Sequence, residues 1–275
     1  MTDLEGTTIG NYLIQKRLGT GAMGTVYLAV HNAIGKRLAI KILAGHLTDD
    51  RGMVERFMLE ARAIGQLEHP NIIEMFDYGT LEDGRLYYTM EYLQGETLSQ
   101  RIKRGQVTLG EIRDVLAQVC DALEVVHRNG IIHRDLKPSN LFLAHRGARM
   151  VVKILDFGIA KIPNTGEDGE QLTSTGAVLG TPVYMSPEQA LAQNYQVTHL
   201  SDLYSLGVIL YKCLCGNYPI VGSLIPEVVA YHLLQEAIPI RQFNPNIPEA
   251  ICEVVMRCLR KKPLERYGSA SDLCV

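Results

Sequence analysis

The eight residues from His133 to Asn140, which read H-R-D-L-K-P-S-N, constrain this chain more than any other stretch. They gather three basic side chains, one carboxylate and one carboxamide, a mixture that a hydrophobic core does not require. An amphipathic pattern precedes them and stops at Gly130, so we expect a loop at the end of a helix. Such a loop suits phosphoryl transfer, which uses a carboxylate to orient a hydroxyl, a cation near the moving group and an amide oxygen for a metal. Asp135, Lys137 and Asn140 fit those roles in that order.

A glycine-rich turn lies near the start of the chain. Residues 12–18 predict a strand, and residues 25–30, which are rich in β-branched and aromatic side chains, predict a second one. The turn between them contains Gly19, Gly21 and Gly24. Glycines allow backbone amides to approach phosphate oxygens closely. In dinucleotide-binding folds the third glycine opens a helix, so the strand–turn–strand context argues against that alternative, while an ordinary hairpin is the other interpretation of the turn alone.

A lysine and two acids complete the set of candidate groups. Lys41 ends a predicted strand, and Glu60 falls on the apolar stripe of a helix predicted over residues 49–66. An acid on an inward face is costly unless it is paired, and Lys41 is a candidate partner for Glu60. An exposed strand lysine and a solvent-facing acid are the alternatives. Asp156, in the sequence Asp-Phe-Gly, offers a second carboxylate for a metal.

Helices dominate the patterns in the second half of the chain. Residues 111–129 carry one apolar stripe, formed by Ile112, Val115, Leu116, Val119, Leu123 and Val126. The longest apolar run, residues 203–215, contains Lys212 and is too short to cross a bilayer. We therefore expect a buried helix there.

Taken in this order, the motifs resemble those of protein kinases. The resemblance is closest to the bacterial serine/threonine protein kinases of eukaryotic type, to which residues 186–190 and 203–207 are particularly similar, and it covers essentially the whole chain. It implies an α+β, bilobal protein-kinase fold. A small antiparallel five-stranded N-lobe with one helix would occupy residues 1–93, and a larger, mainly helical C-lobe would occupy residues 94–275.

The resemblance implies transfer of the ATP γ-phosphoryl group to Ser/Thr hydroxyls of proteins. Asp135 would orient the hydroxyl and accept its proton, and Lys137 would offset charge on the phosphoryl group. Lys41, paired with Glu60, would hold the α- and β-phosphates. The cofactor would be Mg²⁺, with Mn²⁺ as an alternative, and its ligands would be Asn140 and Asp156.

The nucleotide would bind between the lobes. Met90 would be the gatekeeper behind adenine, residues 91–93 the hinge, and Phe142 the floor. The full set implied for ATP binding is Leu18, Gly19, Gly21, Gly24, Val26, Ala39, Lys41, Met90, Glu91, Leu93 and Phe142.

A polar stretch, residues 164–171, precedes Thr173 and Thr175. A plain solvated loop is one interpretation. The resemblance implies instead an activation loop phosphorylated on these two threonines, with Arg134 as the cation that a phosphothreonine would engage. Thr181 would bind the catalytic carboxylate and lysine and shape the substrate-docking surface.

Two acids are expected to have structural roles. Asp202 suits a helix N-cap, and the resemblance implies that it also braces the catalytic-loop backbone. Glu188 would pair with Arg266. The chain departs from the family's usual pattern at two positions. At Ser186, where Ala is common, a small residue should be tolerated. At Lys262, where Asp is more frequent, the departure puts local capping in doubt rather than catalysis.

Serine/threonine rather than tyrosine specificity depends on Lys137, which stands two residues after Asp135. A pseudokinase, which would bind partners without catalysis, is one alternative, although the catalytic residue types are all present. A small-molecule kinase of the same fold is another, but such enzymes generally lack the docking segment of residues 181–188.

Composition sets the expected partners and compartment. The net charge of −3 gives no overall basic field for nucleic acid. None of the six cysteines forms a C-x-x-C pair, which favours reduced thiols in the cytoplasm. No signal peptide or membrane segment is expected, although a longer protein containing this chain could be membrane-anchored. The expected partners are protein substrates and, for phosphorylation in trans, a second copy of the chain.

Overall fold

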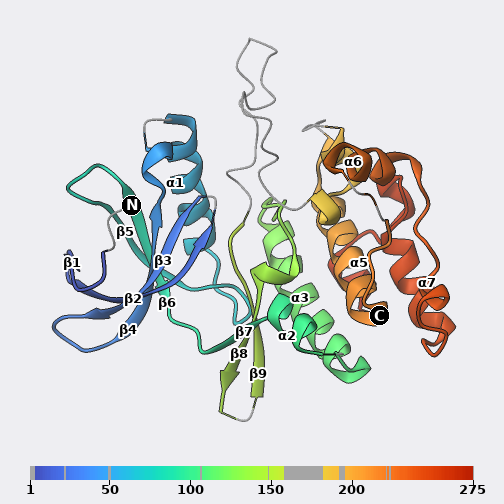
Figure 1. Cartoon of the computed structure of the whole chain (residues 1–275), viewed down its shortest axis with the longest axis horizontal. Coiled ribbons are helices and arrows are strands. Elements are labelled where there is room, and N and C mark those ends of the chain that lie inside the picture. The colour runs from blue at the N-terminus through green and yellow to red at the C-terminus, as the bar shows by residue number, and fades with distance from the viewer. Residues whose placement is uncertain are drawn as a thin grey trace. The chain divides into compact units, whose positions relative to one another are not determined.

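The computed structural model of this 275-residue chain describes residues 4–21, 23–48, 51–105, 107–147, 149–157, 182–191, 196–220, 222 and 224–274. The chain divides into two compact units, which are described separately. Unit 1 comprises residues 1–68 and 72–94, and unit 2 comprises residues 69–71 and 95–275. The α+β class expected from the sequence is confirmed, since unit 1 is built on an antiparallel sheet and unit 2 is mainly helical (Figure 1).

The sheet of unit 1 has the strand order β1-β2-β3-β4-β6-β5, and all its neighbouring strands are antiparallel. Its strands are β1 (Thr8–Ile9), β2 (Tyr12–Gly21), β3 (Gly24–His31), β4 (Arg37–Leu43), β5 (Met75–Thr80) and β6 (Leu86–Glu91). The sequence indicated five strands, and the sixth is the two-residue β1, which is too short for an alternating pattern to reveal.

A short 3-10 turn, η1 (Gly45–Leu47), and the helix α1 (Arg51–Gly65) connect the strands β4 and β5. The ring of Phe57 on α1 stacks on that of Tyr88 on β6, with centroids 4.9 Å apart. Both side chains are almost fully buried, so α1 closes one face of the sheet. A second cluster of buried residues includes Ile14, Tyr27, Ala29, Leu38, Ile40, Ile42 and Tyr87.

Unit 2 contains a smaller antiparallel sheet beside the loop that holds the charge cluster. Its order is β7 (Gly95–Thr97), β8 (Leu141–Arg146) and β9 (Arg149–Ile154). A single 3-10 turn, η2 (Pro138–Asn140), leads directly into β8.

Capping boxes begin the two helices that precede this loop. Thr97 caps α2 (Leu98–Arg104) and Thr108 caps α3 (Leu109–Arg128), each with a Gln or Glu three residues later. The buried positions of α3 include Ile112, Val115, Val119, Leu123 and Val126, which confirms the apolar stripe. The helix ends at Arg128 with Asn129 as its C-cap, and Gly130 follows with a left-handed φ of 70°.

The helix α5 (His199–Cys215) lies at the centre of unit 2 and is buried over most of its length, as its long apolar run predicted. Gly207 permits close packing against α7 (Glu249–Cys258), because a Cβ there would lie 2.6 Å from the Cβ of Cys258. The other elements are η4 (Pro182–Tyr184), α4 (Pro187–Ala190), α6 (Ile225–Leu234), η6 (Ile240–Gln242), η7 (Pro263–Glu265) and α8 (Ala270–Leu273).

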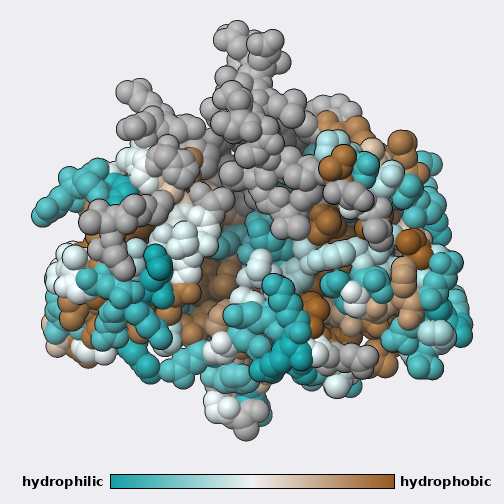
Figure 2. All heavy atoms as spheres, viewed as in Figure 1, coloured by the Kyte–Doolittle hydropathy of each residue, from teal (hydrophilic) through white to brown (hydrophobic). Residues whose placement is uncertain are grey.

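The described helices include none that combines the length and the apolar character needed to cross a bilayer. Hydrophobic side chains do reach the surface around α6, where brown spheres gather in Figure 2. Leu224 and Leu234, at the two ends of this helix, are 63% and 82% exposed.

Candidate active site

The segment from His133 to Asn140 is a loop at the end of α3, as its sequence indicated, and a buried histidine organises it. His133 is fully buried; its Nε2 lies 3.0 Å from the carbonyl oxygen of Leu155, and its Nδ1 lies 3.2 Å from the backbone nitrogen of Asp135. Since a carbonyl only accepts and a backbone N–H only donates, the neutral ring with its proton on Nε2 satisfies both contacts. Burial lowers the pKa of His133 and supports this neutral form.

The carboxylate of Asp202 holds the same loop by its backbone. Its Oδ2 accepts the N–H of His133 at 2.8 Å, and its Oδ1 accepts the N–H of Arg134 at 2.9 Å. This is the bracing contact that the resemblance implied. The N-cap role predicted for Asp202 is wrong, because α5 begins earlier: its N-cap is Thr198, whose hydroxyl accepts the N–H of Leu200.

A second histidine, His127, completes the surroundings of Asp202. It lies in the last turn of α3, and its Nε2 is 2.8 Å from Asp202 Oδ2. The two side chains are 8% and 1% exposed, so the contact is shielded from solvent. Burial alone would raise the pKa of Asp202, but the hydrogen bonds from the His127 ring and from the backbone N–H of His133 outweigh it and keep the pKa below its usual value.

The side chains of Lys137 and Asn140 both contact Asp135. Lys137 Nζ lies 2.8 Å from Asp135 Oδ2. Asn140 Nδ2 donates to the carbonyl oxygen of Asp135 at 2.9 Å and lies 3.3 Å from Asp135 Oδ2. Asp135 and Lys137 remain 17% and 22% exposed, so a substrate can reach them.

Asp156 is tied to the loop through Asn140. Asn140 Nδ2 lies 3.3 Å from the carbonyl oxygen of Asp156, and the backbone N–H of Leu155 donates to the carbonyl oxygen of Asn140 at 2.8 Å. Asp156 has φ 45° and Arg134 has φ 63°, and these are the two non-glycine residues with positive φ among those described. This conformation is unfavourable for a side chain with a Cβ, so the surrounding hydrogen bonds must hold it.

The oxygens of Asp156 and Asn140 fit a divalent cation that takes its remaining ligands from water and phosphate. The described part of the chain has no group of three or more His, Cys, Asp or Glu that could hold a metal ion. Mg²⁺ usually takes one or two protein oxygens and completes its shell with water and phosphate. The Asp156 carboxylate and Asn140 Oδ1 supply that number of oxygens, and Asn140 directs its Nδ2 into the contacts above.

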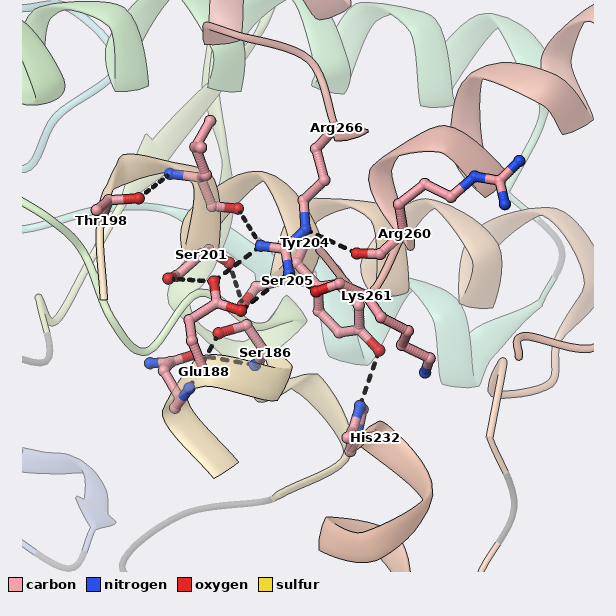
Figure 3. A network of polar contacts seen from close by, with 12 residues as sticks. Ser186, Glu188, Thr198, Ser201, Tyr204, Ser205, His232, Arg260, Lys261 and Arg266 are labelled. Atoms are coloured by element: carbon pink, nitrogen blue, oxygen red, sulfur yellow. Dashed lines mark hydrogen bonds and ion pairs between the residues drawn. The ribbon is translucent and has the colours of Figure 1, made fainter. Parts of the chain in front are cut away.

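Glu188 and Arg266 form the pair that the resemblance implied (Figure 3). Two parallel bonds of 2.8 and 2.9 Å join them, and the Ser201 hydroxyl donates to Glu188 Oε1 at 2.6 Å. The guanidinium N–H groups of Arg266 also donate to the carbonyl oxygens of Leu200, Arg260 and Lys261. The buried guanidinium is therefore fully hydrogen-bonded.

The two departures from the family pattern have different local outcomes. Ser186 caps α4 by accepting the N–H of Gln189 at 3.4 Å, a bond that Ala could not make. Lys262 occupies the N-cap of η7 without a side-chain cap bond, which agrees with the doubt about capping there. Gln189 also donates to the carbonyl oxygen of Arg134 at 2.8 Å and so links α4 to the catalytic loop.

In unit 1, the strand register brings several predicted nucleotide-binding residues onto one face of the sheet. Val26 lies opposite Lys41, and Ala39, two residues before Lys41, lies opposite Met90. Residues that pair across strands share a face, and so do residues two apart on one strand. Lys41 is 5% exposed, and its Nζ lies 5.6 Å from the ring centroid of Tyr88.

The three glycines of the turn differ in what they permit. A Cβ on Gly24 would lie 2.0 Å from the carbonyl oxygen of Ile42, whereas a Cβ on Gly19 would meet nothing within 4 Å. Gly24 is therefore required by the close pairing of β3 with β4. A Cβ on Gly21 would contact only the carbonyl oxygen of Gly24, at 3.9 Å. Leu18 is 41% exposed where β2 shifts its register against β3.

The remaining nucleotide-binding predictions fall at the end of β6 and on β8. Glu91 is fixed to Glu74 by two bonds: the Glu91 backbone N–H donates at 2.9 Å to the Glu74 carbonyl oxygen, and Glu91 Oε1 accepts the Glu74 backbone N–H at 3.0 Å. Leu93 and Phe142 are both partly buried, and Phe142 pairs with Thr97 across the sheet of unit 2.

Some predicted residues lie outside the described part of the chain. They are Thr173, Thr175 and Thr181. The backbone of Glu60 belongs to α1, but its side chain is not described, so its pairing with Lys41 stays a prediction.

Reasoning from the sequence missed three polar residues that support the site: His127, Gln189 and Asn71. His127 lies four residues after Leu123 on the apolar stripe, which is a signal that it is buried. Gln189 sits three residues after a capping Ser, but its bond to the catalytic loop has no local signal. Asn71 donates at 2.9 Å to Gln118 and at 2.8 Å to the carbonyl oxygen of Val152, and these contacts are also distant in sequence.

Comparison with known proteins agrees with this geometry. Residues 12–274 match the family described as protein kinase domain. The chain is 42% identical over 267 residues to serine/threonine-protein kinase Pkn1 of Myxococcus xanthus, covering 97% of this chain and 38% of that protein. It is 35% identical over 265 residues to PrkC of Bacillus subtilis, and this alignment covers 96% of this chain and 39% of PrkC. It is 38% identical over 275 residues to PknA of Mycobacterium tuberculosis, and this alignment covers 98% of this chain and 61% of PknA.

The chain thus spans between about two fifths and three fifths of the length of these curated relatives. A solved structure, that of the PknI kinase domain of Mycobacterium tuberculosis, has the same fold. The TM-score is 0.74 at 26% identity, over 98% of this chain and 96% of that one.

Proposed function

This chain belongs to the protein kinase domain family, and from that premise we propose that it transfers the γ-phosphoryl group of ATP to Ser and Thr hydroxyls of proteins. The observation that carries the proposal is the contact of Asp135 with both Lys137 and Asn140 on one braced loop. A carboxylate, a cation and a carboxamide at these distances are what in-line phosphoryl transfer requires.

Each side chain of the loop has one task in the proposed reaction. Asp135 accepts a hydrogen bond from the incoming hydroxyl, orients it and takes its proton. Lys137, 2.8 Å from that carboxylate, offsets the negative charge that develops on the transferred group. Asp202 fixes the loop backbone, so little reorganisation is needed when the substrate arrives.

Protein kinases use ATP together with a divalent cation, and we assign magnesium to the oxygens of Asn140 and Asp156. When bound, the ion would neutralise phosphate charge. Lys41 is assigned to the α- and β-phosphates, and Glu60 to holding Lys41 in place. The adenine contacts are assigned to Val26, Ala39, Met90, residues 91–93 and Phe142.

The proposal extends to specificity and control. Serine/threonine preference is assigned to Lys137, whose ammonium is 2.8 Å from the catalytic carboxylate, and the names of the relatives support this preference. We further propose autophosphorylation on Thr173 and Thr175 between two copies of the chain, in the cytoplasm where ATP is available. A kinase-shaped binding module is disfavoured because the sequence contains every catalytic residue type, at Lys41, Glu60, Asp135, Asn140 and Asp156.

The test is an autophosphorylation assay with ATP and Mg²⁺, followed by mass mapping of the phosphosites. The wild-type chain should gain phosphate on Thr173 or Thr175, and Asp135→Asn should lower the rate by about 10²- to 10⁴-fold, since general-base catalysis contributes roughly that factor. Asp114→Asn is the matched control, because this carboxylate is exposed on α3 and pairs with Arg113.

Two outcomes would contradict the proposal. Nucleotide binding without phosphate transfer by the wild-type chain would favour a binding module. Faster transfer to small alcohols than to a denatured protein mixture would favour a small-molecule kinase.

A further inference from the structure

The last described helix, α8, packs on α3 and brings two cysteines together. The backbone N–H of Ser271 donates to Glu124 Oε2 at 3.2 Å, and Cys274 Sγ lies 3.9 Å from the carbonyl oxygen of Leu116. Cys120 lies four residues from both of these α3 residues, so it occupies the same face between them. Side chains of a helix tilt toward its N-terminus, which places the Cys120 thiol over the turn that Cys274 contacts.

The two thiols also interact directly. A hydrogen bond with Cys274, together with burial, raises the pKa of Cys120. The same hydrogen bond lowers the pKa of Cys274, whose thiol also donates to the carbonyl oxygen of Leu116 at 3.9 Å.

Their accessibility differs in a way that matters for oxidation. Cys120 is 2% exposed, whereas the side chain of Cys274 is exposed to solvent. Of the six cysteines, all of which are described and free, Cys274 is the one that is exposed. An accessible thiol with a lowered pKa beside a second, shielded thiol is the arrangement typical of peroxide-sensitive cysteine pairs.

We propose that Cys274 and Cys120 are a site of reversible thiol oxidation, at which a peroxide converts the pair to an intramolecular disulfide. In the first step the Cys274 thiolate attacks hydrogen peroxide; an S–O bond forms, the O–O bond breaks, and hydroxide leaves. In the second step Cys120 attacks the sulfenic acid sulfur, and the S–O bond breaks. The hydroxyl group departs with the Cys120 proton as water. Two thiols are oxidised and one peroxide is reduced.

The disulfide would tie α8 to α3 across a long intervening stretch of chain. That stretch contains the catalytic loop and all of α5. Closing so long a loop restricts the unfolded chain, so oxidation should raise the resistance of unit 2 to unfolding. The site is independent of the proposed phosphoryl transfer and can be tested without measuring it.

The experiment uses the whole chain, first reduced and then exposed to hydrogen peroxide. Remaining thiols are blocked with N-ethylmaleimide, and peptides are mapped by mass spectrometry without reduction. The expected product is one peptide pair joined through Cys120 and Cys274, with two fewer blockable thiols and a mass lower by two hydrogen atoms. Dithiothreitol should reverse both changes, and the oxidised chain should unfold at a higher temperature.

Cysteine variants identify the pair. Cys274→Ser changes an exposed side chain and should abolish the linkage with the fold intact, and Cys120→Ala should do the same. Cys213→Ser, on α5, is the matched control and should leave the linkage unchanged. Three results would overturn the proposal: Cys274 oxidised to sulfinic acid without a cross-link, Cys274 joined to a second chain, or Cys274 left reduced while other cysteines react.

Discussion

The carboxylate of Asp202 accepts the backbone N–H of Arg134 at 2.9 Å, and Arg134 has a φ of 63°. A fully buried acid on α5 thus holds a strained residue next to the catalytic carboxylate of Asp135. Arg134 keeps this strained conformation only while Asp202 accepts its N–H and the neighbouring N–H of His133.

Asp202→Ala should therefore impair both folding and catalysis. It leaves two buried backbone N–H groups without their acceptor, at a cost of about 1–3 kcal/mol each. Urea unfolding should report the loss of stability, and the phosphorylation rate should fall further than the folded fraction does. Asp114→Asn, an exposed change on α3, serves as control; equal effects of the two variants would contradict the proposed brace.

His127→Phe should lower kcat while leaving the KM for ATP unchanged. Phe keeps an aromatic ring at this position, but Asp202 loses the hydrogen-bond donor that lay 2.8 Å away. The catalytic loop would then shift, and a small displacement can cost up to about 100-fold in rate. His127→Gln, whose amide can donate to the same carboxylate, should recover part of the rate.

His199→Phe is the matched control for that series. This neighbouring histidine lies with its ring centroid 5.5 Å from that of His127 and contacts the carbonyl oxygen of Gly268 instead of Asp202. A similar fall in kcat for both variants would point to packing rather than to the carboxylate contact.

Glu188→Gln should destabilise the chain by about 3–5 kcal/mol at neutral pH, because it leaves the buried Arg266 charge without its counter-ion. Burial alone would raise the pKa of Glu188, but the bond and charge of Arg266 outweigh it and lower the pKa below the ordinary value of 4.5. In the folded chain the pair therefore contributes stability above pH 4.5, and this contribution is lost as the pH falls through the lower folded value.

Urea unfolding of wild type and Glu188→Gln across this pH range tests the direction in which the pair's contribution to stability changes with pH. The stability difference should be constant above pH 4.5 and shrink below it. The double variant Glu188→Gln with Arg266→Met should recover part of the loss, since it removes the unpaired charge. A difference that grows on acidification would refute the assignment.

Gly24→Ala should lower the melting temperature, whereas Gly19→Ala should not. The added Cβ at position 24 would lie 2.0 Å from the carbonyl oxygen of Ile42, and the one at position 19 would meet nothing within 4 Å. If the glycine-rich turn covers phosphates as proposed, Gly19→Ala should instead raise the KM for ATP. Thermal melts and ATP titrations of the two variants separate structural from binding effects.

The sequence was most informative where structure depends on near neighbours. The apolar stripe of α3 and its stop at Gly130 placed the catalytic loop, because helical period and left-handed glycine conformations are local properties. The N-cap assigned to Asp202 was wrong because Thr198 competes successfully for that role four residues earlier.

Contacts between distant residues could not be predicted in the same way. His127 and Asp202 are 75 residues apart, and nothing near either residue specifies the other. The same holds for Gln189 and the carbonyl oxygen of Arg134, which are 55 residues apart. Such contacts depend on tertiary packing, which brings residues of α3, α4 and α5 together at the catalytic loop.

The placement of Asn71 has a consequence for how the chain could be divided. Residues 69–71 belong to unit 2 although unit 1 flanks them on both sides, and Asn71 bonds there to Gln118 and Val152. The polypeptide therefore passes from one unit to the other three times. A gene split after Gln94 would not encode two self-sufficient halves, because the first product would carry a piece that completes the second. Reassembly of the two split products should therefore require residues 69–71 of the first product to bind again to unit 2, where Asn71 contacts Gln118 and Val152.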